Sequence, residues 1–149
     1  MIISSNGFNF IKKFEACCLH AYPDPITKGQ PWTIGYGWTQ QVDGKNIHPG
    51  MVITAEKAEE LLAKGLKEYE LVLNTKIIVL LTQNQFDACI SLTYNIGLSA
   101  FLNSTLLKKI NANLIKEAAD EFLRWNKVNG RSIRGLTLRR KAERELFLS

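Results

Sequence analysis

The sequence predicts a mainly helical α+β fold. Residues 19–53 are rich in proline, glycine and polar turn residues, whereas the chain after Thr54 repeats apolar residues at helical spacing. We therefore expect one domain, residues 1–149, in which a small β-containing lobe (19–53) and a larger helical lobe (54–149 plus 1–18) enclose a cleft. With 149 residues, 46% of them hydrophobic, the chain can bury one core and has no room for a second module.

The first helix is expected over residues 6–18. Side-chain caps precede it, and apolar residues then recur at helical spacing: Phe8, Ile11, Phe14 and Cys18. Glu15 follows Ile11 by four positions, so its carboxyl group should lie on the apolar side of the helix. Partial burial and the negative end of the helix dipole both favour the protonated form, which a general acid requires.

Asp24 lies in a different setting. Pro23 and Pro25 flank it, and the polar turn residues 26–31 follow. We therefore expect a solvated, ionised carboxylate at this position.

Residues 32–39 alternate bulky and small side chains, as a strand with one bulky and one bare face does. Thr33 should lie on the bare face, where its hydroxyl can hold a water molecule, and Gly37 lets a ligand approach the backbone. A protonated carboxyl group at Glu15, an ionised one at Asp24 and a water between them would equip an inverting glycosidase.

Each of these residues also has a purely structural interpretation. A glutamate on an apolar face is often an edge residue that reaches solvent, and an aspartate between prolines is often only a turn former. A Gly-x-Gly strand is a weaker signal still. The order and close spacing of the three features favour the catalytic interpretation.

The remaining helices are expected from periodicity and end signals. A long helix follows Thr54 and continues to Leu73, and Thr82 and Gln85 form a capping box for the next, which ends at Gly97. Shorter helices are expected near residues 104–111, 114–125 and 136–147. Core packing accounts for all of these apolar stripes.

The net charge is +5, and basic residues gather near the C-terminus. They include Arg131, Arg134, Arg139, Arg140, Lys141 and Arg144. A basic surface attracts anionic wall polymer or nucleic acid, and a solvated helix face requires neither. The chain shows no nucleic-acid recognition motif, so we expect no nucleic-acid partner. The sequence leaves open whether one of the arginines lies against Glu15.

The sequence gives little indication of a metal site or of thiol chemistry. Cys17, Cys18, Cys89, His20 and His48 show no metal-ligand spacing, so we expect no metal and no cofactor. A Ser/His triad is equally unconvincing. Without a recognisable signal peptide or an apolar run of about 18 residues, we expect synthesis in a reducing cytoplasm, with free thiols rather than a disulfide switch.

Three separated blocks of sequence resemble the phage-type lysozymes, the endolysin family that includes the T-even phage enzyme. The first runs from Phe14-Glu15 through Tyr22-Pro23-Asp24 to Trp32-Thr33-Ile34-Gly35-Tyr36-Gly37. The second contains Gln85-Phe86-Asp87-Ala88 and Tyr94-Asn95-Ile96-Gly97, and the third contains Gly130-Arg131, Arg139-Arg140 and Glu143-Arg144. Together they cover nearly the whole chain in the family's order.

The resemblance implies a lysozyme-like fold and hydrolysis of the β-1,4 bond between N-acetylmuramic acid and N-acetylglucosamine in peptidoglycan. By position, Glu15 becomes the general acid, Asp24 the carboxylate that orients or activates water, and Thr33 the hydroxyl that positions this water. Tyr94 and Ser104 would line the sugar cleft. Their structural alternatives are a helix-packing aromatic and an N-cap.

Two departures from the family pattern stand out. The turn formed by residues 26–31 is a few residues longer than usual, and Trp38 replaces the usual histidine, so aromatic packing would replace an ion pair. As an endolysin the chain would be a monomer in the host cytoplasm that depends on a separate holin to reach the periplasmic wall. An antibacterial effector or prophage remnant would share this chemistry, and a basic binding module without catalysis remains the alternative from another class.

Overall fold

The computed structural model describes residues 1–149 and divides into two compact units. The first unit consists of Met1–Phe10 and Lys67–Ser149, and the second consists of Ile11–Leu66. Helices and two short antiparallel strand pairs form the regular structure of the chain, so the predicted α+β class is confirmed.

Two helices belong partly to each unit. They are α1 (Ser5–Phe14) and α2 (Ala55–Lys76). The second unit is therefore wider than the lobe of residues 19–53 expected from composition, because it includes the helical segments that flank the turn-rich region.

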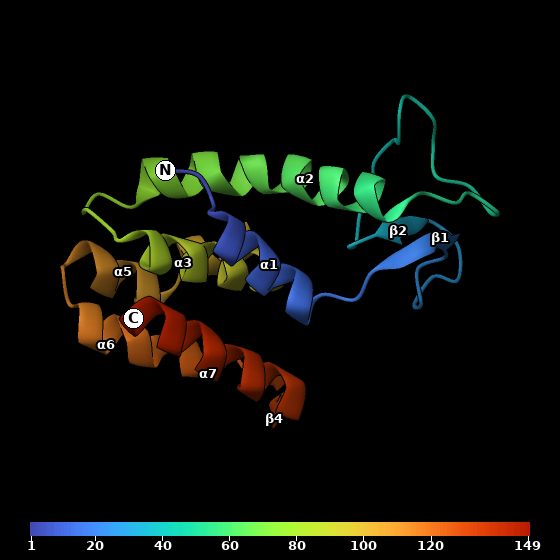
Figure 1. Ribbon diagram of the computed structural model, residues 1–149. Coiled ribbons are helices and arrows are strands. Elements are labelled where there is room, and N and C mark those ends of the chain that lie inside the picture. Colours follow the sequence, from blue (N-terminus) through green and yellow to red (C-terminus); the bar gives the residue numbers. More distant parts are fainter. The chain divides into compact units, whose positions relative to one another are not determined.

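The second unit is built around strand β1 (Cys18–Tyr22), which pairs antiparallel with β2 (Thr33–Gly35; Figure 1). The other edge of β1 bonds to Met51–Ile53, since the N–H of Ala21 donates to the Met51 carbonyl at 2.9 Å and that of Ile53 to the Leu19 carbonyl at 2.9 Å. A small apolar core supports this sheet, and its members are Ile34, Val42, Ile47, Met51, Ile53, Ala58 and Leu61.

Helix α1 is shorter than the predicted helix over residues 6–18. It ends at Phe14, and Cys18 lies in β1 opposite Gly35. The apolar period continues to Cys18, but the strand pairing competes with the helix and determines the backbone there. One helical bond persists beyond the end, from the N–H of Glu15 to the carbonyl of Ile11 at 3.0 Å.

The predicted strand over residues 32–39 is also too long. Gly35 and Gly37 have φ angles of 67° and 89°, outside the β region. The chain turns there, and Ile34 and Trp38 exchange two backbone hydrogen bonds of 2.9 Å. The alternation of bulky and small side chains over residues 32–39 therefore continues past the strand into a tight turn.

The first unit contains six further helical segments (Figure 1). They are α3 (Gln83–Ile96), α4 (Leu98–Leu102), α5 (Thr105–Asn111), α6 (Ile115–Glu121), the 3-10 helix η1 (Phe122–Arg124) and α7 (Arg134–Leu148). The predicted capping box at Thr82 and Gln85 is present, and Gly97 follows α3 with a φ of 94°. Helix α4 was not predicted, and the helix predicted at 114–125 is divided into α6 and η1. No helix combines the length and apolar composition needed to cross a lipid bilayer.

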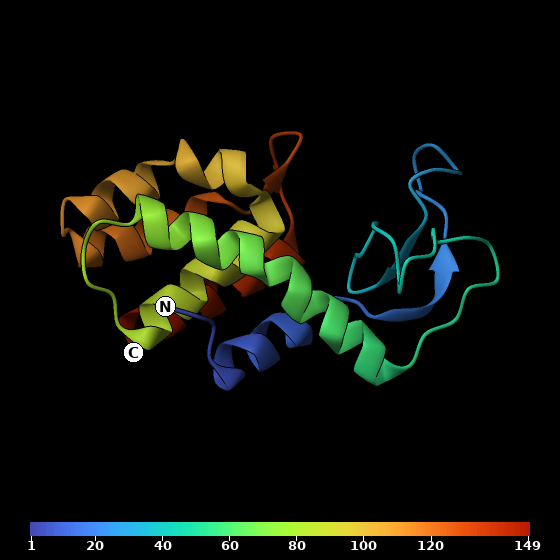
Figure 2. The ribbon, with the colours of Figure 1, turned by 90° about the horizontal axis from the view of Figure 1, so that it is seen from above.

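A hairpin interrupts the part of the chain that was expected to be entirely helical. Strands β3 (Lys127–Val128) and β4 (Arg131–Ser132) pair antiparallel, and the hairpin projects from the helices of its unit in Figure 2. Asn129 and Gly130 form its turn, with φ angles of 51° and 77°. The Asn-Gly pair is the usual signal for such a two-residue turn.

Asp87 fixes the start of α1 to α3. Its side chain is fully buried, and it accepts hydrogen bonds from the Ser4 backbone at 3.1 Å, from the Ser4 hydroxyl and from the Gln83 amide at 2.9 Å. Gly7 passes so close that a Cβ atom there would lie 2.7 Å from the Asp87 Cβ atom. Only a glycine fits at this point of the helix.

We therefore predict opposite effects from two Gly→Ala substitutions in helices. Gly7→Ala should lower the free energy of unfolding by about 1–3 kcal/mol, because the new methyl group overlaps the buried Asp87 side chain. Gly135→Ala, at a position in α7 with nothing within 4 Å, should raise it by up to about 1 kcal/mol. Urea unfolding followed by circular dichroism measures both, and equal effects would contradict the close contact at Gly7.

Candidate functional site

Glu15 comes directly after the last residue of α1 and is half-buried. Its carboxylate has an electrostatic effect on the phenol of Tyr22 in β1. The pKa of the Tyr22 phenol is raised, first by burial, then by the nearby Cys18 and Glu15 side chains. Glu15 is therefore within electrostatic reach of Tyr22.

Asp24 organises the loop that follows β1. Its Oδ1 atom accepts backbone hydrogen bonds from Ile26 at 2.8 Å and Thr27 at 2.9 Å. Its own backbone N–H donates to the Gly29 carbonyl at 3.0 Å, and its carbonyl accepts from Lys28 at 2.7 Å. Asp24 is thus a turn former, as one interpretation expected. Its Oδ2 atom has no protein partner and is available to a water molecule, so the catalytic interpretation is compatible with this role.

Thr33 is the first residue of β2 and faces Tyr22 in the strand pair. Asp24 follows Tyr22 by two residues, so Thr33 and Asp24 lie at the same end of the sheet. The Thr33 hydroxyl donates a hydrogen bond of 3.3 Å to the Pro31 carbonyl, which leaves its oxygen able to accept another.

Tyr22 is the residue that the sequence reasoning missed. It lies opposite Thr33, two positions before Asp24 and within electrostatic reach of Glu15. The motif contained it, but its position depends on the register of the strand pair, which the sequence alone does not specify. The three predicted catalytic residues thus gather around one strand residue.

Gly37 and Trp38 lie in the turn after β2. Gly37 is exposed, so its backbone is accessible. Trp38 packs against the small core, its indole N–H donates to the Gln41 carbonyl at 3.1 Å, and the Lys64 ammonium lies 5.7 Å from the ring centroid. Packing against the core and the indole hydrogen bond therefore hold Trp38 in the turn.

Tyr94 and Ser104 belong to the first unit. Tyr94 is half-buried on α3 and makes an edge-to-face contact with Tyr69, with ring centroids 5.8 Å apart. Ser104 is buried and caps α5, because its hydroxyl accepts from the Leu107 backbone at 3.1 Å and donates to the Phe101 carbonyl at 2.6 Å. Tyr94 is thus a helix-packing aromatic residue and Ser104 an N-cap, as their structural interpretations expected.

Two of the C-terminal arginines lie in the interior of the first unit. Arg140 pairs with Glu143 at 2.7 Å, and Arg139 pairs with the same carboxylate at 3.3 Å. Ser91 of α3 donates its hydroxyl to Glu143, and its carbonyl accepts from Arg139 at 3.1 Å. This buried cluster joins α7 to α3.

The cysteines are free thiols: Cys17 is exposed, Cys18 is half-buried and Cys89 is buried. Burial raises the pKa of the Cys89 thiol, which therefore stays protonated and unreactive at neutral pH. No three His, Cys, Asp or Glu side chains lie close enough together to hold a metal ion.

Two carboxyl groups and a hydroxyl around a short strand pair form the side-chain set of a carboxylate-based glycosidase. The family model for phage lysozyme matches residues 12–143. The chain therefore belongs to the phage lysozyme family and is an enzyme of the lysozyme class.

Individual relatives agree with this family. The chain is 47% identical over 149 residues to the endolysin of Salmonella phage P22 and covers 99% of it. It is 44% identical to the endolysin of Bacillus phage B103, of which it spans 55%. A crystal structure of a P22 lysozyme mutant matches with a TM-score of 0.91, 46% identity and coverage of 100% and 99% of the two chains. The muramidase domain of SpmX from Asticaccaulis excentricus matches with a TM-score of 0.87 and 36% identity, covering 99% and 97%.

The raised pKa of Tyr22 predicts a loss of stability at alkaline pH. An unfolded chain releases the phenol proton near pH 10.0 and the folded chain only at higher pH, so this group destabilises the fold as pH rises above 10. Tyr22→Phe should therefore lose less stability than wild type between pH 8 and pH 11. Urea unfolding at the two pH values measures this, and parallel losses in both proteins would contradict the assignment.

Proposed function

We propose that this protein hydrolyses the β-1,4 bond between N-acetylmuramic acid and N-acetylglucosamine in bacterial peptidoglycan and thereby lyses the host cell. The pairing of β1 with β2 carries the proposal. It sets Thr33 opposite Tyr22, and Asp24 follows Tyr22 by two residues. Glu15 lies within electrostatic reach of the same tyrosine.

The three residues would divide the chemistry. Glu15 donates a proton to the glycosidic oxygen as the bond breaks. Asp24, through the Oδ2 atom that its loop leaves unpaired, orients or deprotonates a water molecule, which the Thr33 hydroxyl also holds. Attack by this water on the opposite face of the sugar inverts the anomeric centre, which requires about 6.5–9.5 Å between the two carboxyl groups.

Three further residues are proposed to contact the glycan. Gly37 presents an exposed backbone, which supports close approach of a sugar. Tyr94 and Ser104 rest on the resemblance to phage lysozymes, and their contribution stays a prediction. The division of the chain into a lobe of residues 19–53 and a helical remainder stays a prediction as well.

Replacing Glu15 with glutamine should abolish most of the activity. The amide cannot donate the catalytic proton, so Glu15→Gln should lower the rate at least about 100-fold. The measurement is turbidity clearing of outer-membrane-permeabilised Gram-negative cells, with folding checked by circular dichroism. Glu145→Gln, the same change at an exposed position of α7, serves as the matched control and should clear at the wild-type rate. Thr33→Val should also clear slowly, and Thr33→Ser, which restores the hydroxyl, should recover much of the rate.

Two results would count against this function. Clearing by a folded Glu15→Gln protein at the wild-type rate would remove Glu15 from the mechanism. No clearing by a folded wild type would favour a wall-binding module without catalysis. Analysis of the released sugars identifies the bond that is cut.

We also propose that the chain acts as a monomer and reaches the periplasmic wall from the host cytoplasm through a membrane lesion made by a separate holin. Gram-negative cells that express the chain alone should keep their turbidity until a holin is co-expressed or chloroform is added. Lysis by the chain alone would contradict the holin requirement, and gel filtration tests the monomer.

A further inference from the structure

The loop that joins α2 to α3 in the first unit is both apolar and exposed (Figure 1). Its residues 77–81 read Ile-Ile-Val-Leu-Leu and alternate between half-buried and exposed side chains. The exposed ones are Ile78 and Leu80, with 78% and 99% of their surface in contact with solvent. Ile2 is exposed beside them, since its carbonyl accepts a hydrogen bond of 2.9 Å from Gln83 at the start of α3. Exposed apolar side chains that gather on one surface mark an interaction site.

The backbone of this loop is only partly paired. The N–H of Ile78 donates to the Asn111 side chain at 2.9 Å, and the same side chain donates to the Lys76 carbonyl at 2.9 Å. These bonds hold the start of the loop against α5. The N–H groups of residues 79–81 donate no hydrogen bond within the protein. They require water or another external acceptor, so the loop suits a boundary between polar and apolar surroundings.

A hollow of about 330 Å³ opens beside the loop. Leu80 and Leu81 line it together with Leu73 and Phe86 of the adjoining helices, and Asn74 is its one polar lining residue. The Asn74 side chain is already engaged, because it donates to the Met1 carbonyl at 2.7 Å. An aliphatic chain would gain apolar contacts in this hollow that water cannot provide.

The charges around the loop are positive. Between Leu71 and Lys116 the chain contains one acidic residue, Asp87, which is fully buried and hydrogen-bonded. Lys76 directly precedes the loop, and Lys108 precedes Asn111 by three residues on α5, so both lie beside the loop. Both lysines are exposed and make no ion pair. The loop thus combines apolar side chains with uncompensated positive charge.

The acidic residues that border this stretch do not cancel its charge. Glu70 accepts a hydrogen bond of 2.7 Å from the backbone N–H of Ile3, and Glu117 directly follows Lys116 in α6. The remaining lysine of the stretch, Lys109, pairs with Glu121 at 2.8 Å. The free charge beside the loop is therefore that of Lys76 and Lys108.

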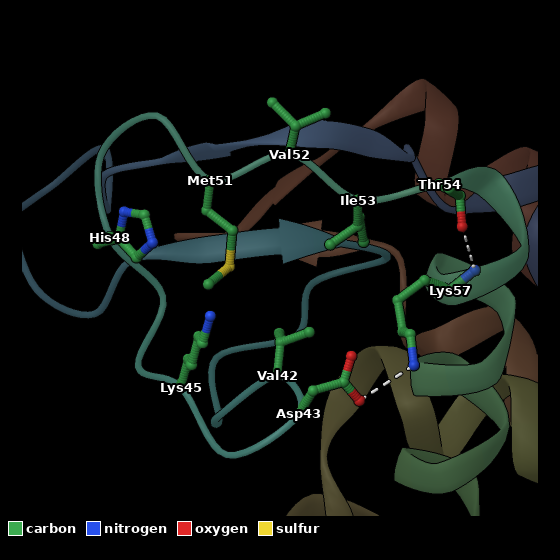
Figure 3. A pocket seen from close by; sticks show the side chains of 9 residues that line it. All are labelled: Val42, Asp43, Lys45, His48, Met51, Val52, Ile53, Thr54 and Lys57. Atoms are coloured by element: carbon green, nitrogen blue, oxygen red, sulfur yellow. Dashed lines mark hydrogen bonds and ion pairs between the residues drawn. The ribbon is translucent and has the colours of Figure 1, made fainter.

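The pocket of about 430 Å³ in the second unit offers no comparable surface (Figure 3). Its apolar residues Val42, Met51 and Ile53 belong to the small core and are at most 9% exposed. On its rim, Asp43 is already paired with Lys57 at 3.1 Å. The apolar side chains of the loop, in contrast, are presented directly to solvent.

We propose that residues 77–81 bind the surface of a lipid bilayer that contains anionic lipids. Ile78 and Leu80 enter the boundary between headgroups and acyl chains, and Lys76 and Lys108 pair with lipid phosphates. Phosphate and ester oxygens at that depth accept hydrogen bonds from the free N–H groups of residues 79–81. The contact is peripheral, because so short a loop cannot span a bilayer. It goes beyond the proposed hydrolysis and does not depend on it.

A second copy of the chain fits this surface less well. In a two-fold dimer the same patch occurs on both partners. Lys76 and Lys108 of each copy would then face those of the other, and the loop carries no acidic residue to oppose them. Like charges brought together across an interface disfavour association. An anionic bilayer instead supplies the opposite charge.

Flotation with phosphatidylglycerol vesicles tests the contact. Wild type should float with the vesicles, and Leu80→Gln should lower the partition coefficient at least about tenfold, because an apolar side chain is lost from the contact. Lys76→Gln should lower it about fivefold, through loss of one charge near the anionic surface. Leu138→Gln, the same change at an exposed position of α7, is the matched control and should partition as wild type does.

Equal partitioning of wild type and Leu80→Gln, or no flotation of wild type, would overturn the proposal. Equally strong binding to phosphatidylcholine vesicles would overturn the requirement for anionic lipid. A dimer in gel filtration that Leu80→Gln dissociates would assign the loop to a second copy of the chain instead. Because Leu80 is almost fully exposed, Leu80→Gln should keep its circular dichroism spectrum and its rate of wall clearing. The vesicles contain no peptidoglycan, so flotation gives an answer even if the chain fails to hydrolyse glycan.

Discussion

The pairing of β1 along both of its edges is the constraint on which the second unit depends. On one edge it sets the register that places Thr33 opposite Tyr22, and on the other it fixes Met51–Ile53 beside the strand. Strands this short are marginal by themselves and require apolar support. That support comes from the small core, which includes Ala58 and Leu61 of α2. Substitutions in this core should therefore disturb the candidate catalytic residues even where they touch none of them.

The two candidate carboxylates are held by different means. Glu15 depends on the end of α1, because its backbone N–H donates to the carbonyl of Ile11 at 3.0 Å and continues the helical bonding by one residue. Asp24 instead depends on its own loop, which uses only one of its carboxylate oxygens. Because local hydrogen bonds close the Asp24 loop, the turn between Asp24 and Thr33 leaves the strand pair intact. Most residues of this turn are exposed, and all of residues 25–31 lie outside the ladder.

The sequence predicted those features that depend on residues close together in the chain, such as helix caps. The capping box at Thr82 and the cap at Ser104 were readable because the partners lie within one turn. The end of α1 could not be predicted in this way. Cys18 continues the apolar period of the helix, and it lies in a strand only because it pairs with Gly35, which is distant in the sequence. For the same reason the sequence indicated Glu15, Asp24 and Thr33 by spacing but passed over Tyr22, whose place depends on the strand register.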